Sequence, residues 1–267
     1  MTDIAAAAAA LLGVEIREAR PLAGGDLSAV VLLSLADGRC AVAKSGEGAR
    51  REGAMLAAIA ATGVPAPAVL AVEDGLLVME HVPAAGVVSD AWDDLARALG
   101  LLHAAQGSAY GWDADHAFGS VLIANAVTDD WPAFWGDRRL RPQIAHVDTD
   151  LAHRIERLAD RLADLLPAHP PPSLLHGDLW GGNVLAADGH VAALIDPACY
   201  YGHREVDVAM LTLFDAPPRA FFDVLDLEAG WQARLHIYRL WPLLVHLRLF
   251  GSQYQGPVAK ALATLGY

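Results

Sequence analysis

The chain has 267 residues, and its 32 acidic and 19 basic side chains give a net charge of −13 with histidine neutral. This acidic balance argues against a general nucleic-acid-binding protein, because such proteins carry a basic surface for the phosphates. Hydrophobic residues make up 54% of the chain and charged residues 19%, which excludes intrinsic disorder. The length is typical of one large domain or of two small lobes.

The chain has two cysteines, Cys40 and Cys199, which are too few for a disulfide framework, so we expect a protein of the reducing cytoplasm. Both are expected to be small buried side chains. The apolar stretch 4–12 near the N-terminus is shorter than the roughly twenty residues that a membrane-spanning helix needs. Asp3 precedes this stretch and no basic residue does, so it is not expected to be a signal peptide. We therefore predict an N-terminal helix there and no membrane partner.

The first eighty residues predict a small α+β unit. Two Asp-Gly turns each join a pair of strands, and a short strand is expected before residue 23. The other predicted elements are a helix at 4–12, strands at 27–35 and 39–44, an amphipathic helix at 50–61, and strands at 68–73 and 76–80. The composition changes at Pro83 and Gly86, so we place a boundary there and predict lobes of residues 1–82 and 83–267.

Beyond this boundary the chain is predicted to be mainly helical. Ser89 is the expected cap of the first helix, and the apolar residues of the segment 150–166 recur at spacings of three and four. A hairpin is expected to turn at Asp188-Gly189. The predicted helices are 89–103, 131–140, 150–166, 205–214 and 230–250.

The sharpest motif begins with His176-Gly177-Asp178 and continues with Asn183 and, eighteen residues after Asp178, with Asp196. Phosphoryl transfer needs a carboxylate that orients and deprotonates the attacking hydroxyl, and oxygen ligands that hold Mg²⁺ on the nucleotide phosphates. A loop of this length places Asp178 and Asn183 on one side of a cleft, and the following hairpin returns Asp196 to face them. Because Mg²⁺ keeps several waters, two protein ligands suffice. The spacing is that of the catalytic centre of the protein-kinase-like fold.

The N-terminal lobe supplies independent support for this interpretation. Lys44 ends a predicted strand, like the kinase lysine that contacts the nucleotide phosphates. Glu52 lies on the next predicted helix, where an ion-pair partner for that lysine is expected. Alone, each residue would be more typical of a solvated surface. The order of strand, helix, strand pair, linker and catalytic loop favours the kinase interpretation.

Further nucleotide contacts are expected from main-chain groups. Gly24 and Gly25 lie between the first strands and would let backbone amides approach phosphates, although an ordinary hairpin turn explains them equally well. The expected adenine-binding backbone lies at the lobe junction, in Met79, Glu80, His81 and Val82. The chain contains no Walker A sequence, so a P-loop nucleotide-binding protein is disfavoured.

These motifs resemble those of the fructosamine kinases, also called ketosamine 3-kinases, which are relatives of the aminoglycoside phosphotransferases and choline kinases. The likeness covers nearly the whole chain. The wider superfamily shares the loop from His176 to Asn183, and Trp180 with Gly182-Asn183 is more particular to the fructosamine kinases. The other segments that resemble this family are Tyr110–Trp112, Asp130–Trp135, Arg141–Gln143, Ile195–Asp207 and Leu249–Tyr254.

The resemblance implies an α+β, two-lobed protein-kinase-like fold, with a small N-lobe of antiparallel sheet and one main helix and a larger, mainly helical C-lobe. It implies ATP and Mg²⁺ as cofactors, and transfer of the γ-phosphoryl group to a sugar hydroxyl of a ketosamine such as fructosamine or ribulosamine. The ketosamine 3-phosphate then decomposes and frees the amine, so the implied activity is deglycation repair. Carried over by position, the site contains Asp178 as catalytic base, Asn183 and Asp196 as metal ligands, Lys44 and Glu52 as the phosphate-anchoring pair, and Asp207 as a brace of the catalytic loop.

The acceptor implied by the resemblance is a small-molecule or protein-bound glycated amine. Its sugar is expected near Trp180 and near the turn that contains Tyr201 and His203, because this turn follows the metal aspartate and can face the base. For a cationic amine, the acidic groups Glu205 and Asp215 are available. Glu205 is also typical of a helix start, and Asp215 of a solvated loop charge.

One departure from the family concerns the residue after the paired glycines. Some members have a cysteine there and form a disulfide between subunits. Asp26 stands at this position in the chain, so no such redox switch is expected. We favour a monomer on this ground.

Two other functions remain open. An aminoglycoside or choline phosphotransferase would use the same catalytic residues, and Trp180 with the 200–207 segment favours a ketosamine instead. A non-catalytic kinase-like binding module would commonly lack at least one catalytic residue, whereas Lys44, Asp178 and Asp196 are all present. Consumption of ATP would separate this module from the enzymes.

Overall fold

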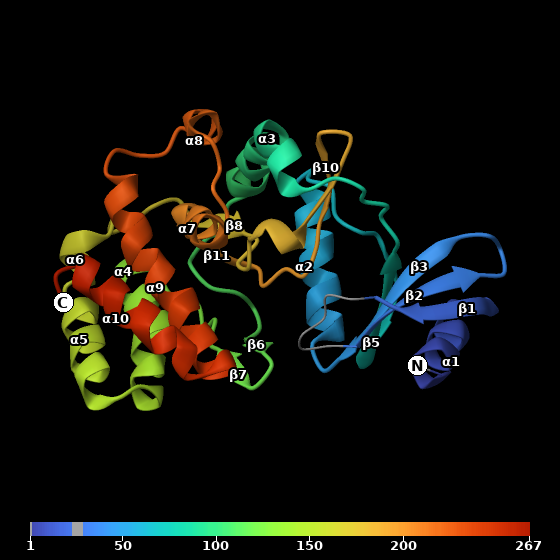
Figure 1. Ribbon diagram of the computed structural model, residues 1–267, viewed down its shortest axis with the longest axis horizontal. Helices are drawn as coiled ribbons and strands as arrows, with labels where there is room; N and C mark the ends of the chain where they lie inside the picture. Colours follow the sequence, from blue (N-terminus) through green and yellow to red (C-terminus); the bar gives the residue numbers. More distant parts are fainter. Residues whose placement is uncertain (1, 23–28) are drawn as a thin grey trace. The chain divides into compact units, whose positions relative to one another are not determined.

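The computed structural model describes residues 2–22 and 29–267. The chain forms two compact units (Figure 1). Unit 1 consists of residues 1–98 and 182–197, and unit 2 consists of residues 99–181 and 198–267. This division differs from the sequence boundary at residue 82, because a later hairpin is hydrogen-bonded to the N-terminal part of the chain at Pro65 and Gly86 and to the start of the next helix at Asp94.

Unit 1 is built, in its described residues, around a five-stranded antiparallel sheet in the order β1-β2-β3-β5-β4. The strands are β1 (Ile16–Pro21), β2 (Ala29–Leu35), β3 (Cys40–Gly46), β4 (Val69–Glu73) and β5 (Gly75–Glu80). The helices α1 (Thr2–Leu12) and α2 (Ala49–Ala61) flank the sheet. The predicted small N-terminal α+β unit is confirmed.

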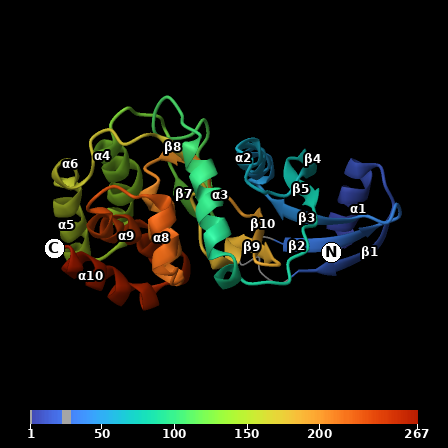
Figure 2. The same cartoon turned by 90° about the horizontal axis from the view of Figure 1, so that it is seen from above.

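Side chains alternate between the two faces of the sheet, and each face packs against a different helix. Leu33 and Leu35 of β2 join Ala8 of α1 in one buried cluster. Leu32 points to the opposite face and lies in a second cluster with Leu56 of α2. Strands β4 and β5 accordingly lie between α2 and α1 in Figure 2. The central strand β3 is therefore held by packing on both of its faces.

A hairpin far along the sequence completes unit 1. Its strands are β9 (Val184–Ala187) and β10 (His190–Leu194). The predicted turn is confirmed, since Asp188 and Gly189 have φ of 51° and 77°, the two positive values that a two-residue type I′ turn requires. The Leu194 N–H donates to the Pro65 carbonyl (2.8 Å), and a second hairpin amide donates to Asp94 in the first turn of α3 (Trp92–Ala104), also at 2.8 Å.

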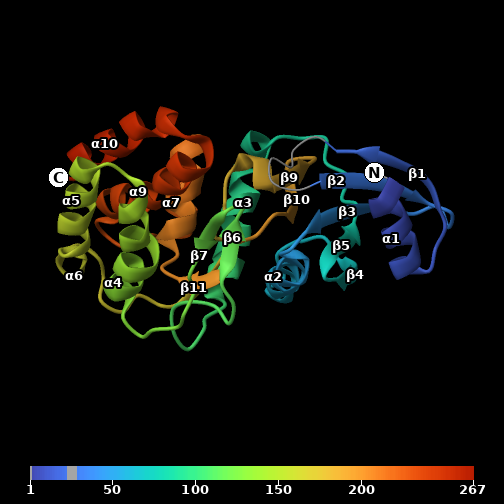
Figure 3. The same cartoon turned by 90° about the horizontal axis from the view of Figure 1, so that it is seen from below.

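Unit 2 is mainly helical. Beyond the end of α3, its described helices are α4 (Trp131–Phe134), continued by a π-helical turn (Trp135–Leu140), α5 (Thr149–Ala159), α6 (Leu162–Leu165), α7 (Glu205–Phe214), α8 (Arg219–Leu225), α9 (Trp231–Phe250) and α10 (Gln255–Thr264). Small sheets pair β6 (His116–Phe118) with β7 (Val121–Ile123), and β8 (Ser173–Leu175) with β11 (Tyr200–Gly202). Helix α9 packs against α7 and α10 (Figure 3). Within 2–22 and 29–267, no helix has both the length and the apolar composition needed to span a bilayer.

Two predicted helices of this region differ from the structure. Ser89 lies in a short 3-10 turn and α3 begins at Trp92, so the predicted cap is wrong. The expected helix 150–166 is interrupted at Arg161, whose φ of −103° and ψ of 0° separate α5 from α6. The apolar spacing continues across the interruption because both helices bury the same stripe against the core.

A buried arginine fixes β11. The guanidinium of Arg139 lies 4.3 Å from the ring centroid of Tyr200 on β11, and near those of Phe134 and Trp241. It also donates to the amide oxygen of Asn125 (2.7 Å). These aromatic faces and hydrogen bonds stabilise a charge that burial alone would disfavour. The paired strand β8, which leads into the catalytic loop, is thereby held in place.

Candidate active site

A lysine between two carboxylates forms the first part of the site, within unit 1. Lys44 lies on β3 with the strand parity of Val42, so its side chain points to the face covered by α2. Its Nζ lies 2.9 Å from Glu52 on α2 and 2.8 Å from Oδ1 of Asp196. Lys44 and Glu52 are 15% and 14% exposed, against 37% for Asp196. The structure therefore brings together three residues that the sequence predicts as parts of one site.

The electrostatics of this cluster keep the lysine charged. Burial opposes the charge on Lys44, but the carboxylates of Glu52 and Asp196 outweigh burial and raise the pKa of Lys44 above its ordinary value. The ammonium group is largely buried, so water screens its contact with an anion less than it would at the surface. The cluster is thus suited to contact phosphate groups.

The open end of the β9–β10 hairpin brings Asn183 and Asp196 together. The Ile195 N–H donates to the Asn183 carbonyl at 3.0 Å, which continues the hairpin ladder by one more pair. Asp196 then adopts a left-handed backbone with φ of 53°. Asn183 is buried, whereas the Asp196 side chain is partly exposed. Within unit 1, the hairpin thus returns Asp196 beside Asn183; that it also faces Asp178 stays a prediction.

The donor set at this hairpin suits Mg²⁺. Asn183 and Asp196 offer amide and carboxylate oxygens, which are the ligands that this hard cation prefers, and water can complete its coordination. In the part of the chain that the structure describes, no three His, Cys, Asp or Glu side chains gather in a metal-binding group. A closed zinc site of four protein ligands is therefore not formed by these residues.

The loop that carries Asp178 belongs to unit 2 and is held by a buried carboxylate. Oδ2 of Asp207 on α7 accepts from His103 Nε2 and from the His176 N–H, and Oδ1 accepts from the Gly177 N–H, all at 2.9 Å. Burial alone would raise the pKa of Asp207, but these donors outweigh it and hold the pKa below its ordinary value. The predicted brace is thus a fully ionised carboxylate that fixes the two residues before Asp178.

Gly177 makes the sharp bend that presents the base. Its φ is +82°, and a Cβ at this position would lie 2.0 Å from the Ala198 carbonyl oxygen. Glycine is therefore required both for the backbone conformation and for the close approach of the segment that precedes β11. Asp178 follows the bend half-buried, and its N–H donates to His176 Nδ1 at 3.3 Å. The side chain of His176 thereby holds the main chain of the loop at Asp178.

The loop continues past Asp178 to an aromatic pair and an acidic side chain. Trp180 is 41% exposed, and its ring centroid lies 6.2 Å from that of Phe214 at the end of α7. The next amide, Gly181 N–H, donates to Oδ2 of Asp215 at 2.7 Å. Asp215, expected as a solvated loop charge, is instead bonded to the catalytic loop.

Two residues proposed for substrate contact have structural roles instead. Glu205 is fully buried and accepts two hydrogen bonds from Arg234, at 2.8 and 2.5 Å, so its charge is already compensated. His203 is buried, with Nδ1 2.8 Å from the Tyr238 hydroxyl. Burial, reinforced by nearby arginines such as Arg204, lowers the pKa of His203 to about 3. Neither side chain is accessible to a substrate in unit 2, so their expected role as substrate contacts does not agree with the structure.

Tyr201, the remaining residue predicted on this turn, lines a surface cavity. Its ring centroid lies 5.5 Å from that of Trp112. The cavity has a volume of about 330 Å³ and is also lined by Ser108, Asp113 and Val127. Tyr201 is therefore half-exposed in a hollow of unit 2, as a ligand contact requires.

The predicted nucleotide-binding backbone is described in part. Met79 and Glu80 end β5, with Met79 buried in the cluster under α2 and Glu80 exposed, and His81 and Val82 follow the strand half-buried. Gly24 and Gly25, and with them Asp26, lie outside the described residues.

Several features of the site escape sequence analysis. The bond from Gly181 to Asp215 spans 34 residues, and the only local signal is an aspartate between a helix and two prolines. The two thiols also differ from expectation. Cys199 is buried as predicted, whereas Cys40 at the start of β3 is exposed.

Solved structures place the chain in the class of protein-kinase-like folds. A crystal structure of a candidate fructosamine-3-kinase from Thermobifida fusca YX-ER1 matches with a TM-score of 0.90 and 29% identity, over 99% of each chain. An aminoglycoside phosphotransferase, solved as a ternary complex with ADP and hygromycin B, matches with a TM-score of 0.69 over 98% of each chain. At 17% identity, the second likeness shows the fold alone.

The chain belongs to the fructosamine kinase family, whose sequence model matches residues 2–265. A curated relative from Synechocystis sp., named as a probable ketoamine kinase, is 36% identical over 184 residues. That alignment covers 65% of this chain and 61% of the relative, so the match spans less than two thirds of the relative's own length. Relatives with such names are phosphotransferases whose acceptor is a hydroxyl group.

Proposed function

We propose that this chain is an ATP-dependent kinase that phosphorylates a sugar hydroxyl of ketosamines such as fructosamine or ribulosamine. The observation that carries this proposal is the charged lysine held between Glu52 and Asp196, in a chain whose Asp178 loop is fixed by a buried ionised carboxylate. Membership of the fructosamine kinase family supports the choice of acceptor.

The nucleotide side of the reaction is assigned to unit 1. Lys44 would bind the phosphates and compensate their charge, with Glu52 holding its ammonium in position. Asn183 and Asp196 would hold Mg²⁺, which when bound neutralises charge on the phosphate oxygens. The Gly24-Gly25 amides and the main chain of residues 79–82 are proposed as further nucleotide contacts.

The acceptor side is assigned to unit 2. Asp178 would orient the sugar hydroxyl and accept its proton as the oxygen bonds to the γ-phosphorus, while the bond to ADP breaks. Asp207 positions Asp178 through the amides of His176 and Gly177. Trp180 and Tyr201 are the exposed and half-exposed side chains proposed to contact the sugar-amine.

The proposed physiological role is deglycation in the cytoplasm. A sugar phosphorylated on the 3-hydroxyl of a ketosamine becomes prone to elimination, which frees the amine of a small molecule or a protein. Two free cysteines, one of them exposed, fit a reducing compartment. We also propose a monomer that binds neither nucleic acid nor membranes.

The proposal is tested by incubating the protein with MgATP and each candidate acceptor and following ADP release together with sugar-phosphate formation. Ketosamines are expected to react fastest, and Asp178→Asn to lower turnover by about 10²–10⁴-fold. Asp188→Asn is the matched control, because it makes the same change in an exposed turn whose positive φ asparagine tolerates. Near-normal turnover of Asp178→Asn would remove the base from the mechanism.

Other outcomes of the same assay separate the alternatives. An aminoglycoside or choline preferred by tenfold or more, about 1.4 kcal/mol of transition-state discrimination, would overturn the ketosamine assignment and leave the kinase assignment intact. No ATP consumption with any acceptor would favour a binding module. Turnover that persists in excess EDTA would refute the Mg²⁺ assignment.

A further inference from the structure

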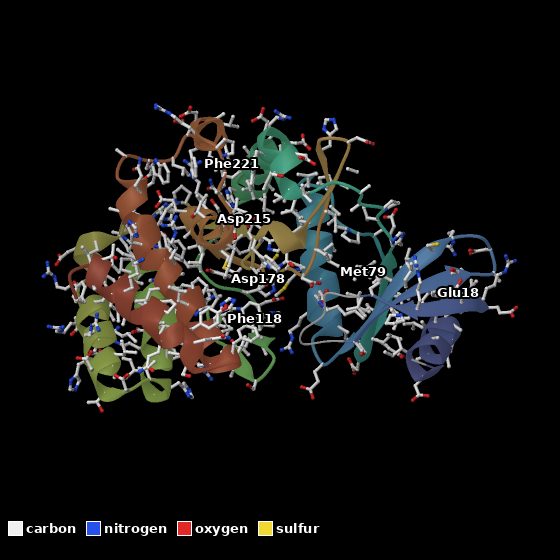
Figure 4. All side chains as sticks on the ribbon, viewed as in Figure 1. Glu18, Met79, Phe118, Asp178, Asp215 and Phe221 are labelled. Carbon is white, nitrogen blue, oxygen red and sulfur yellow. The ribbon has the colours of Figure 1, made fainter. Side chains whose placement is uncertain are left out.

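We propose that Trp180, Phe214 and Asp215 form the subsite for the positively charged amine of the acceptor. The inference rests on the proposed ketosamine kinase function and deepens it by assigning the amine to particular residues. It replaces Glu205, whose carboxylate is buried and paired with Arg234. Figure 4 labels Asp215 together with Asp178, the proposed base, and both belong to unit 2.

The first support is the way in which two segments meet. Trp180 stands two residues after Asp178 on the catalytic loop, and Phe214 with Asp215 ends α7. The two rings lie 6.2 Å apart at 64° to one another, and 41% and 43% of these residues remain exposed. The hydrogen bond from Gly181 to Asp215 ties the loop to the helix end at this point. An exposed aromatic corner with a carboxylate at its edge is therefore fixed beside the proposed base.

The second support is that this carboxylate has no cationic partner among the described residues. Among residues 2–22 and 29–267, Asp215 takes part in no ion pair, and its described hydrogen bond from a neutral amide uses one of its two oxygens. The neighbouring acids already have partners, since Glu205 is paired with Arg234 and Asp207 accepts hydrogen bonds from His103 and main-chain amides. The last carbonyls of the ten-residue helix α7 add partial negative charge at the same place.

The basic side chains near this aromatic corner do not take the place of the substrate amine. Arg239 donates to the hydroxyl of Thr212, on the preceding part of α7, at 2.6 Å. His246 lies 5.3 Å from the Phe214 ring, but burial lowers its pKa, and its Nδ1 bonds to the Pro242 carbonyl. The histidine therefore packs against the Phe214 ring without placing a positive charge on it at neutral pH.

The chemistry of the corner matches a protonated secondary amine. The faces of Trp180 and Phe214 attract a cation through their quadrupoles. The free oxygen of Asp215 can accept a charge-assisted hydrogen bond from the ammonium N–H. A ketosamine carries its amine one carbon from the sugar ring or chain, so the same ligand can place a hydroxyl at Asp178. A neutral or anionic substituent in this position would gain nothing from the carboxylate.

The test compares two ligands that differ in the amine alone. Binding of fructosyl-lysine and of its ether analogue, in which oxygen replaces the amine nitrogen, is measured by calorimetry without nucleotide. Asp215→Asn removes the charge and keeps an oxygen that can accept from Gly181. We expect it to weaken fructosyl-lysine binding about tenfold and to change binding of the ether less than about twofold. Phe214→Leu, which keeps apolar bulk and removes the aromatic face, should show the same selectivity.

The controls separate this inference from the function on which it rests. Asp223→Asn makes the same charge change on the exposed face of α8 and should leave both affinities unchanged. If the wild-type protein phosphorylates ketosamines but Asp215→Asn weakens both ligands equally or neither, the amine subsite is refuted and the kinase function stands. If the wild type neither binds nor phosphorylates ketosamines, both proposals fail. Selectivity with a glycated peptide but not with free fructosyl-lysine would also overturn the assignment to the amine.

Discussion

Replacing Asp207 by asparagine is expected to destabilise the protein by about 3 kcal/mol without removing any packed volume. Asp207 is fully buried and accepts three hydrogen bonds, from His103, His176 and Gly177. Asparagine has nearly the same shape, but one of its two polar atoms is a donor. The variant therefore tests the hydrogen bonds and the charge separately from the cavity that alanine would create.

The magnitude follows from the geometry. In the better orientation, the asparagine oxygen replaces Oδ2 and keeps the hydrogen bonds from His103 and His176. Its NH₂ group then faces the Gly177 N–H. The Gly177 N–H and the asparagine NH₂ are then both buried donors without acceptors, and each costs about 1–3 kcal/mol. The two remaining bonds change from charge-assisted to neutral, which costs about 1 kcal/mol each, and the relief of burying a charge offsets part of this loss.

The sign of the pH dependence follows from the direction of the shift. The pKa of Asp207 is below its ordinary value in the folded chain, so its contribution is fully present above the unfolded pKa of about 4 and is lost as the pH falls through the folded pKa. The difference in stability between wild type and Asp207→Asn should therefore be constant from pH 8 to 5 and narrow only at lower pH.

The assay is urea unfolding of both proteins at several pH values, with Asp223→Asn as a matched control on an exposed helix face. The control should change the free energy of unfolding by less than about 0.5 kcal/mol. A loss below about 1 kcal/mol in Asp207→Asn would refute the reasoning, given the three bonds counted above. A difference that narrows between pH 8 and 6 would assign the titration to a histidine instead.

Three further predictions concern other parts of the site. Lys44→Met should lower kcat by about a hundredfold or more and should affect urea unfolding much less; a loss of activity explained entirely by unfolding would make Lys44 structural. Gly177→Ala should lower the free energy of unfolding by more than about 2 kcal/mol, because the new Cβ would lie 2.0 Å from a carbonyl oxygen. Gly189 has a similar φ but its nearest atom is 3.6 Å away, so Gly189→Ala should lower it by about 1 kcal/mol in the same thermal unfolding experiment. The ring resonances of His203 should not titrate by NMR between pH 8 and 5, and its neutral burial should reduce stability as the pH falls below about 6.5, because the unfolded histidine binds a proton; a midpoint within that range would contradict the burial argument.

The parts of the fold that sequence predicts are those set by local spacing. The Asp-Gly turn at 188–189 needs only two residues with positive φ, and both the turn and its strands are found as predicted. The helix predicted over 150–166 shows the limit of the same approach. Apolar spacing reports which face is buried, and this face continues through the interruption at Arg161. The apolar pattern therefore does not reveal the break in the backbone.

The candidate site shows the same difference between local spacing, which the sequence reveals, and distant contacts, which it does not. Asp178 and Asn183 are five residues apart in one loop, so their spacing carries the chemistry. Whether an acidic side chain is free to bind a ligand depends on partners that are distant in sequence. Glu205 is paired with Arg234 at a separation of 29 residues, whereas Asp215 accepts from a neutral amide at 34 residues and has no cationic partner among the described residues. Such pairings arise from tertiary packing and cannot be inferred from the sequence around either acid.

The discontinuity of unit 1 has a consequence for how the chain is made. Lys44 and its partner Asp196 are 152 residues apart, and a ribosome takes about 8 to 30 s to synthesise that length. Until then the N-terminal part of unit 1 lacks the hairpin whose amides bond to Pro65 and Asp94, and Lys44 has a single carboxylate partner. Closing so long a loop costs little more entropy than closing a shorter one, but contacts of this separation form slowly. The nucleotide side of this protein is therefore completed late, although its first strands are synthesised earliest, and a fragment cut at residue 82 or 98 would lack both the hairpin and Asp196.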